Sequence, residues 1–378
     1  MPSLAVPADG PDTALDRRTQ EAILRAAAAA QSPGTRRAYD SAWARFERWC
    51  ATHQHRPLPA RPDVVAAYLV EAAETVDSDG RRSYAAATLA KWVAAISDRH
   101  RRASCDSDPT QHALVRATAA GLRREYAIAG DRPRTPRDPL LTEDIMALVE
   151  TARAQVTGWA SGVRERRDTA LLLMGFAGAF RRSELVALTG ADLALHPLDG
   201  MHIHVRRSKT DQGGEGRVHA LPRTEDPRRC PPCAYTRWAL AVSAFDRGGR
   251  AALIAAVCGV DDDFEDHLCR RMRPAITGGR AVFRSIAQNG NLSTDALSGA
   301  AVHSAVRRRA ERAGFSEDEV ARLGAHSLRA GFVTQAIRNG ADTVAIMRQT
   351  AHQTPAMVAR YAREKAPLVG NAVTQLGL

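Results

Sequence analysis

The chain has 378 residues, 44% of them hydrophobic, which is enough to bury ordinary cores and excludes a disordered chain. Its formal net charge of +11 favours a polyanionic partner such as DNA, RNA or an anionic membrane, although a basic proteome would also explain it. No stretch reaches the ~18 apolar residues of a membrane span, and the start lacks the pattern of a signal peptide, so we expect a cytoplasmic protein without a membrane partner.

The first third of the chain carries helical patterns. Residues 1–18 hold three prolines by position 11 and are expected to form a flexible tail. After Ser32, a helix-capping residue type, one stripe has helical spacing and consists of Tyr39, Trp43, Phe46 and Cys50. Further helices are expected after Pro62, over residues 83–102 and over residues 110–126. Four amphipathic helices with short connections predict a helical bundle over residues 19–130.

A break separates this bundle from the rest. Residues 131–139 hold three prolines and three arginines, which predicts a basic interdomain linker. In the second domain, residues 140–378, Met201–Arg206 and Arg217–Leu221 both alternate with period two around a Gly-rich turn, as the strands of a hairpin do. We therefore expect a mainly α fold with a small antiparallel sheet, in which a helical bundle precedes a mixed α/β domain.

Cys230 and Cys233 form a CxxC motif. A structural zinc site normally needs a second ligand pair, and a redox motif is expected beside a βαβ pattern, which is not predicted here. The other cysteines are single and scattered: Cys50, Cys105, Cys258 and Cys269. We therefore expect no metal site and no cofactor.

Four short segments of the second domain carry side chains suited to phosphate chemistry. Arg181 is predicted to share a helix face with Leu185 and Leu188, so it needs an anionic partner, either Glu184 or a phosphate. Lys209 lies on the hairpin turn, where lysines are usually solvated.

The last two segments lie near the end of the chain. His326 and Arg329 are spaced i, i+3, which predicts one side of a helix. Thr354 and Pro355 predict a helix start that leaves His352 before the helix and Tyr361 about two turns inside it. Taken singly, each segment is as consistent with packing as with chemistry.

Together, the segments resemble the tyrosine recombinase, or phage integrase, family. The family's ordered set matches Arg181, Lys209, His326, Arg329, His352 and Tyr361, with nine residues from His352 to Tyr361. The bundle resembles the family's core-binding domain through Thr35–Tyr39 and Trp92–Ile96. The resemblance covers roughly residues 30–370, but residues 242–297 match no part of it. Ala351 stands where the family usually has Gly, and we expect its methyl group to shift His352 slightly.

The resemblance implies a site-specific DNA recombinase with a covalent 3′-phosphotyrosine intermediate. Tyr361 would be the nucleophile, His326 its base and Lys209 the acid for the departing 5′ oxygen. Arg181 and Arg329 would stabilise the pentavalent phosphorus. His352 would hydrogen-bond the phosphate, and Glu184 would orient its neighbours.

The implied partner is double-stranded DNA with inverted half-sites, bound by a homotetramer that exchanges strands through a four-way junction, with no small-molecule substrate. A C-terminal assembly tail would follow Tyr361. The expected DNA-binding residues are Arg36, Arg37, Lys91, Arg134 and Arg207. The alternatives are a type IB topoisomerase, a telomere resolvase, and a non-catalytic DNA-binding regulator on the same scaffold.

Overall fold

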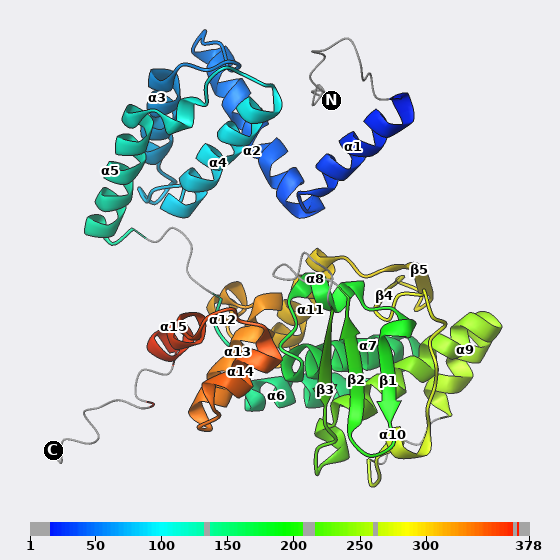
Figure 1. Ribbon diagram of the computed structural model, residues 1–378. Helices are drawn as coiled ribbons and strands as arrows, with labels where there is room; N and C mark the ends of the chain where they lie inside the picture. The colour runs from blue at the N-terminus through cyan, green and yellow to red at the C-terminus, as the bar shows by residue number, and fades with distance from the viewer. Residues whose placement is uncertain (1–15, 132–136, 207–215, 260–263, 366–368, 370–378) are drawn as a thin grey trace, which may run out of the picture. The chain divides into compact units, whose positions relative to one another are not determined.

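The computed structural model describes residues 16–131, 137–206, 216–259, 264–365 and 369 (Figure 1). The chain divides into two compact units, Met1–Thr135 and Pro136–Leu378, each described here by itself. Both units are mainly helical, and the strands form small antiparallel sheets, which confirms the predicted fold class. Within the described ranges, no helix is long and apolar enough to cross a membrane.

The first unit is a bundle of helices. They are α1 (Arg17–Ala29), α2 (Pro33–Thr52), α3 (Pro62–Glu74), α4 (Ala86–Arg102) and α5 (Ala113–Ala129), with a 3-10 turn η1 (Pro109–Gln111) before α5. Ser32 caps α2, because its side-chain oxygen accepts a hydrogen bond from the Thr35 N–H at 3.1 Å. Trp43, Phe46 and Cys50 are buried, as their spacing predicts.

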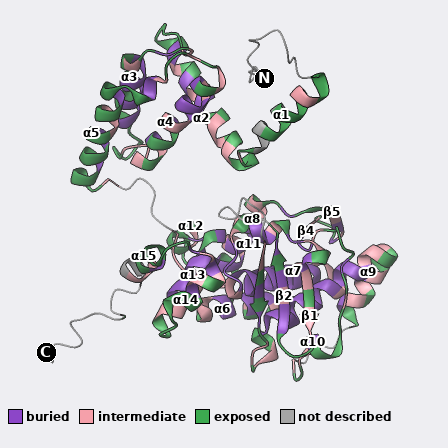
Figure 2. Cartoon of the chain, viewed as in Figure 1, coloured by how far each residue is buried: buried purple, intermediate pink, exposed green. Residues whose placement is uncertain are grey.

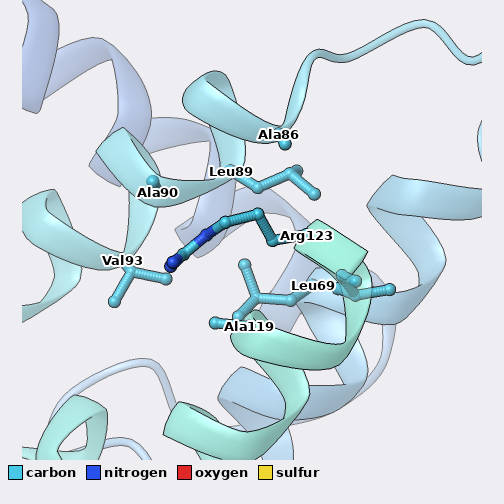
Figure 3. A pocket seen from close by; sticks show the side chains of 8 residues that line it. Leu69, Ala86, Leu89, Ala90, Val93, Ala119 and Arg123 are labelled. Carbon is cyan, nitrogen blue, oxygen red and sulfur yellow. The ribbon is translucent and has the colours of Figure 1, made fainter. Parts of the chain in front are cut away.

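A small apolar hollow lies between helices of this bundle (Figure 3). Leu69 of α3 and Leu89 of α4 line it, and the Arg123 side chain of α5 reaches across it. Its volume is about 30 Å³, room for water and not for a ligand. We interpret the hollow as a packing gap.

The second unit contains more helices, two 3-10 turns and all the strands of the described chain. Its helices are α6 (Thr142–Ala154), α7 (Trp159–Ala177), α8 (Arg182–Ala187), α9 (Pro231–Cys258), α10 (Leu268–Arg271), α11 (Gly299–Arg312), α12 (Glu317–Arg322), α13 (Ala325–Arg338), α14 (Thr343–Thr350) and α15 (Pro355–Lys365), with turns η2 (Gly190–Asp192) and η3 (Pro227–Arg229). Its strands are β1 (Leu193–His196), β2 (Gly200–Val205), β3 (Arg217–Leu221), β4 (Arg284–Ile286) and β5 (Leu292–Ala296).

The larger sheet has the order β1-β2-β3 and is antiparallel throughout. Met201 pairs with Leu221 and Val205 with Arg217, so the predicted hairpin is confirmed. Met201, Ile203 and Val205 point into the core, whereas His204 between them is exposed. Strand β1 and the separate β4–β5 hairpin were not predicted from the sequence.

Helix α7 runs through the centre of the second unit, and buried residues gather along it and along α13 (Figure 2). Buried charged side chains of α7 have partners of opposite charge. Asp168 accepts hydrogen bonds from Arg167 and from Arg309 of α11, at 2.9 Å each. Burial raises the Asp168 pKa, but the two arginines outweigh it and lower the pKa overall. This rigid helix ends at Ala177, immediately before the turn that carries Arg181.

Candidate active site

Arg181 is not part of a helix, which corrects the sequence prediction. It precedes α8 with extended backbone (φ −68°, ψ 146°), so it does not share a helix face with Leu185 and Leu188. The cause is Glu184, whose carboxylate accepts a hydrogen bond from the Arg181 backbone N–H at 2.8 Å and thereby caps the helix start. The other oxygen of Glu184 accepts from Arg181 Nη1 at 2.7 Å, so the anionic partner considered from the sequence is present.

Arg329 enters the same site from α13 and is buried. Its Nη1 donates to the Ala179 carbonyl at 2.6 Å, and its Nη2 donates to the Thr350 carbonyl. Arg181 Nη2 in turn donates to the Ala351 carbonyl at 3.4 Å. The guanidinium groups are thus held by the peptide carbonyls of two turns.

Both alanines, Ala179 and Ala351, have left-handed backbone, with φ of 47° and 51°. This conformation costs a residue with a Cβ about 1–2 kcal/mol, and such strain concentrates at functional sites. Here it aims two carbonyl oxygens at the two arginines. Ala351 is also the C-cap of α14, a position at which glycine is the usual residue.

The two arginines are close enough to influence each other. Burial and the neighbouring Arg181 lower the pKa of Arg329 to about 10, which leaves it charged at neutral pH. Glu184 is the carboxylate that pairs with Arg181 and also favours the charged form of Arg329. Two guanidinium groups beside one carboxylate leave a surplus of positive charge, which suits a phosphate.

Tyr361 lies on α15 with its hydroxyl 3.2 Å from Nε2 of His326 on α13. In Figure 1, α13 and α15 lie side by side at one end of the second unit. The ring of His352 is centred 5.8 Å from the Tyr361 ring, and its Nδ1 hydrogen-bonds the Thr350 hydroxyl at 2.9 Å.

Both histidines are held neutral. Burial first, then Arg329 and Arg181, lower the pKa of His352 to about 4. Although part of the His326 ring is exposed, desolvation lowers its pKa, and the Arg329 and Arg360 cations add to the effect. A neutral imidazole can accept a proton, so His326 is able to act as a base toward the Tyr361 hydroxyl.

Comparison with known proteins agrees with the family resemblance of the sequence motifs. Residues 266–366 match the model of the phage integrase family. An integrase/recombinase XerD homolog of Selenomonas ruminantium is 29% identical over 348 residues, which cover 92% of this chain and 86% of the relative. The chain is therefore similar to tyrosine recombinases of the phage integrase family.

Solved structures of recombinases are similar at lower identity. A Tn1549 transposon integrase in complex with transposon right end DNA has 14% identity and a TM-score of 0.48, covering 84% of this chain and 86% of that chain. A XerH site-specific recombinase bound to a palindromic difH substrate has 15% identity and a TM-score of 0.44, covering 87% and 76%.

The structure brings five of the six predicted catalytic residues together: Arg181, His326, Arg329, His352 and Tyr361. Lys209, Arg207 and Arg134 lie outside the described residues, as does the tail after Lys365 apart from Val369. Arg36, Arg37 and Lys91 are exposed on α2 and α4 of the first unit.

His219 lies near the same arginines and was not predicted from the sequence. It is buried on β3, its ring lies 4.7 Å from that of Phe180, and Arg217 Nε donates to its Nε2 at 3.0 Å. Burial first, then Arg217 and Arg329, lower its pKa to about 3. The alternation along β3 carries the signal, since it places His219 on the inward face with Leu221.

Proposed function

We propose that this recombinase cleaves and rejoins double-stranded DNA through a covalent bond between Tyr361 and a 3′ phosphate. The observation that carries the proposal is the distance of 3.2 Å between the Tyr361 hydroxyl and Nε2 of His326, whose lowered pKa keeps it neutral. His326 lies on α13, the helix that also supplies Arg329. The net charge of +11 and the exposed cations on α2 and α4 support a DNA partner.

In the forward step, the Tyr361 oxygen attacks phosphorus while His326 takes the phenolic proton. The bond from phosphorus to the 5′ oxygen breaks, and Lys209 gives that oxygen a proton. Arg181 and Arg329 bind the non-bridging oxygens, where negative charge develops. Rejoining is the reverse step, in which the 5′ hydroxyl attacks the phosphotyrosine and Tyr361 leaves.

Glu184 and His352 have supporting roles in this scheme. Glu184 fixes Arg181 through two hydrogen bonds, one to its backbone and one to its guanidinium group. His352 faces the Tyr361 ring, with the Thr350 hydroxyl holding its Nδ1, so its Nε2 is left to hydrogen-bond the phosphate.

Complete recombination requires exchange between two DNA duplexes. We propose that a homotetramer on inverted half-sites exchanges strands through a four-way junction, and that the tail after Tyr361, residues 362–378, helps neighbouring subunits to assemble. Truncation after Ala366 should leave binding to one half-site intact and weaken cooperative filling of two, measured by gel-shift titration. Equal filling of the second half-site by the truncated protein would remove the tail from assembly.

Trapping of the covalent adduct tests the proposal. A nicked substrate that loses its short 5′ fragment should leave the wild-type protein attached to DNA on a denaturing gel. Tyr361→Phe deletes only the hydroxyl, so DNA binding should persist and the adduct should vanish. Tyr235→Phe, at a buried tyrosine of the same unit, is the control and should still form the adduct. An adduct formed by Tyr361→Phe would place the nucleophile elsewhere.

A second substrate separates the role of Lys209. Replacing the bridging 5′ oxygen by sulfur gives a leaving group that needs no proton. Lys209→Ala should slow cleavage of normal DNA by about 10²–10⁴-fold and cleave the sulfur substrate at nearly the wild-type rate. Equal impairment on both substrates would exclude Lys209 as the acid.

A further inference from the structure

Four side chains of ligand type converge in the second unit, which we call the catalytic unit because it carries the proposed active site. They lie on elements that the proposed mechanism does not use. Cys230 and Cys233 lie at the start of α9, and His267 and Cys269 lie at and within the short helix α10. One ligand atom from each residue lies within 4.8 Å of all the others. Among the described residues, this is the group whose composition and spacing suit a metal ion.

The distances agree with tetrahedral coordination of a single ion. The Cys233 sulfur lies 3.4 Å from Nδ1 of His267 and 3.5 Å from the Cys269 sulfur. Zinc bonds of about 2.3 Å to sulfur and 2.0 Å to nitrogen separate tetrahedral ligands by about 3.5 Å (S to N) and about 3.8 Å (S to S). We infer that Cys230, Cys233, His267 and Cys269 bind one zinc ion.

A disulfide does not explain the cluster. The cysteines are free, and the 3.5 Å between the Cys233 and Cys269 sulfurs is far longer than the ~2.05 Å of an S–S bond. Simple packing explains part of it, because buried thiols behave as small apolar groups and Leu195 and Leu268 pack against them. Packing gives no reason for an imidazole nitrogen to face a sulfur, whereas coordination does.

The ligand set selects the metal and its role. Three thiolates and one imidazole suit zinc and disfavour magnesium or calcium, which take oxygen ligands. Four protein ligands leave no open position for water or substrate, which marks a structural and not a catalytic ion. The zinc and three thiolates carry a net charge of −1, and the Arg223 guanidinium beside Cys269 offsets it.

The surrounding fold shows what the ion would hold together. Helix α10 has four residues, too few to be stable alone. Coordination would tie it to the first turn of α9 across the 34 positions that separate Cys233 from His267. Leu195 of β1 packs on the same cluster, so the ion would also anchor the edge of the larger sheet.

Elemental analysis of the full-length protein, purified without chelator, tests this inference. We expect about one zinc per chain. Cys233→Ser and Cys269→Ser should lower the content to near zero, whereas Cys258→Ser should not, because Cys258 lies exposed at the other end of α9. Protein expressed with cobalt should show the absorption bands of tetrahedral cobalt–thiolate coordination, and Cys233→Ser should lose them.

A pair of substitutions at His267 keeps the test decisive if the serine variants fail to fold. His267→Cys preserves four ligands and should retain zinc, while His267→Ala should bind it more weakly and release it to a chelator faster. Folded, metal-free protein with reduced thiols would overturn the inference. Equal zinc content in Cys233→Ser and Cys258→Ser, or a disulfide between Cys233 and Cys269, would overturn it as well.

Discussion

Two side-chain clusters of the catalytic unit differ in both charge and exposure. The proposed active site gathers cations around Tyr361 and stays partly open, since the Arg181 side chain retains 17% of its surface and His326 is exposed. The cysteine cluster gathers thiols and is closed, with Cys230 and Cys269 fully buried. An open cluster of surplus positive charge suits an incoming phosphate, and a closed cluster of thiols suits a permanent cation. This difference is what we expect between the active site and the structural zinc site that we propose.

The largest effect is expected at the arginine pair. Arg181→Lys keeps the charge but removes the planar fork that binds Glu184 and, in our proposal, the phosphate. Cleavage should fall by about 10²–10³-fold with DNA binding little changed. Arg182→Lys, at the exposed neighbouring position, is the matched control and should cleave normally. Similar rates for the two variants would mean that Arg181 has no special contact with the reacting phosphate.

The sequence predicted the recombinase cluster because its residues lie in motifs of fixed order. It misplaced Arg181 within a helix because the periodicity of Leu185 and Leu188 does not show where a helix starts. The Glu184 side chain decides that start through a local hydrogen bond to the Arg181 N–H, three positions earlier. A capping box usually begins with Ser or Thr, so an arginine at this position does not signal one.

The cysteine cluster was missed for a different physical reason. The second ligand pair consists of one cysteine and one histidine, and His267 lies 34 positions from Cys233 along the chain. Only the packing of α10 against α9 brings the two halves together. Strand β1 and the β4–β5 hairpin were not predicted either: β1 and β4 have only four and three residues, and β5 (LSTDA) does not alternate between apolar and polar residues.

Acid should weaken the catalytic unit through His219. Its pKa of about 3 in the folded state lies below its ordinary value of 6.5, so the unfolded chain binds the proton more readily. The contribution of neutral His219 to the free energy of unfolding is therefore fully present above pH 6.5 and is lost as the pH falls toward 3. Between pH 7 and pH 5 the loss should be about 2 kcal/mol for this residue.

Urea titrations at pH 7 and pH 5 measure this loss. His219→Gln removes the titrating group, so its free energy of unfolding should change less with pH than that of the wild type. His352 remains in both proteins and contributes equally to them. The same decline in both proteins would show that burial and the neighbouring arginines do not hold His219 neutral.

A smaller effect is expected at Ala351, where this chain departs from the family's glycine. Its left-handed backbone, with φ of 51°, is strained by its Cβ. Ala351→Gly should therefore raise the free energy of unfolding by up to about 1 kcal/mol. Ala345→Gly, inside α14, is the control and should lower it by about 1 kcal/mol. Destabilisation by both substitutions would show that Ala351 carries no such strain.

The smallest effect, close to none, is expected when a chelator is added to the cleavage reaction. In the proposed mechanism, Arg181 and Arg329 supply the positive charge that a magnesium ion would otherwise bring to the phosphate. Across the described residues, the group suited to a metal is the cysteine cluster, whose buried ligands should release zinc slowly. Cleavage in EDTA without magnesium should therefore stay within about twofold of the untreated rate.

Prolonged chelation in mild denaturant should instead lower the stability of the protein, with recovery on adding zinc and none on adding magnesium. Immediate loss of cleavage that magnesium restores would place a metal in the chemistry and remove the distinction between the two clusters.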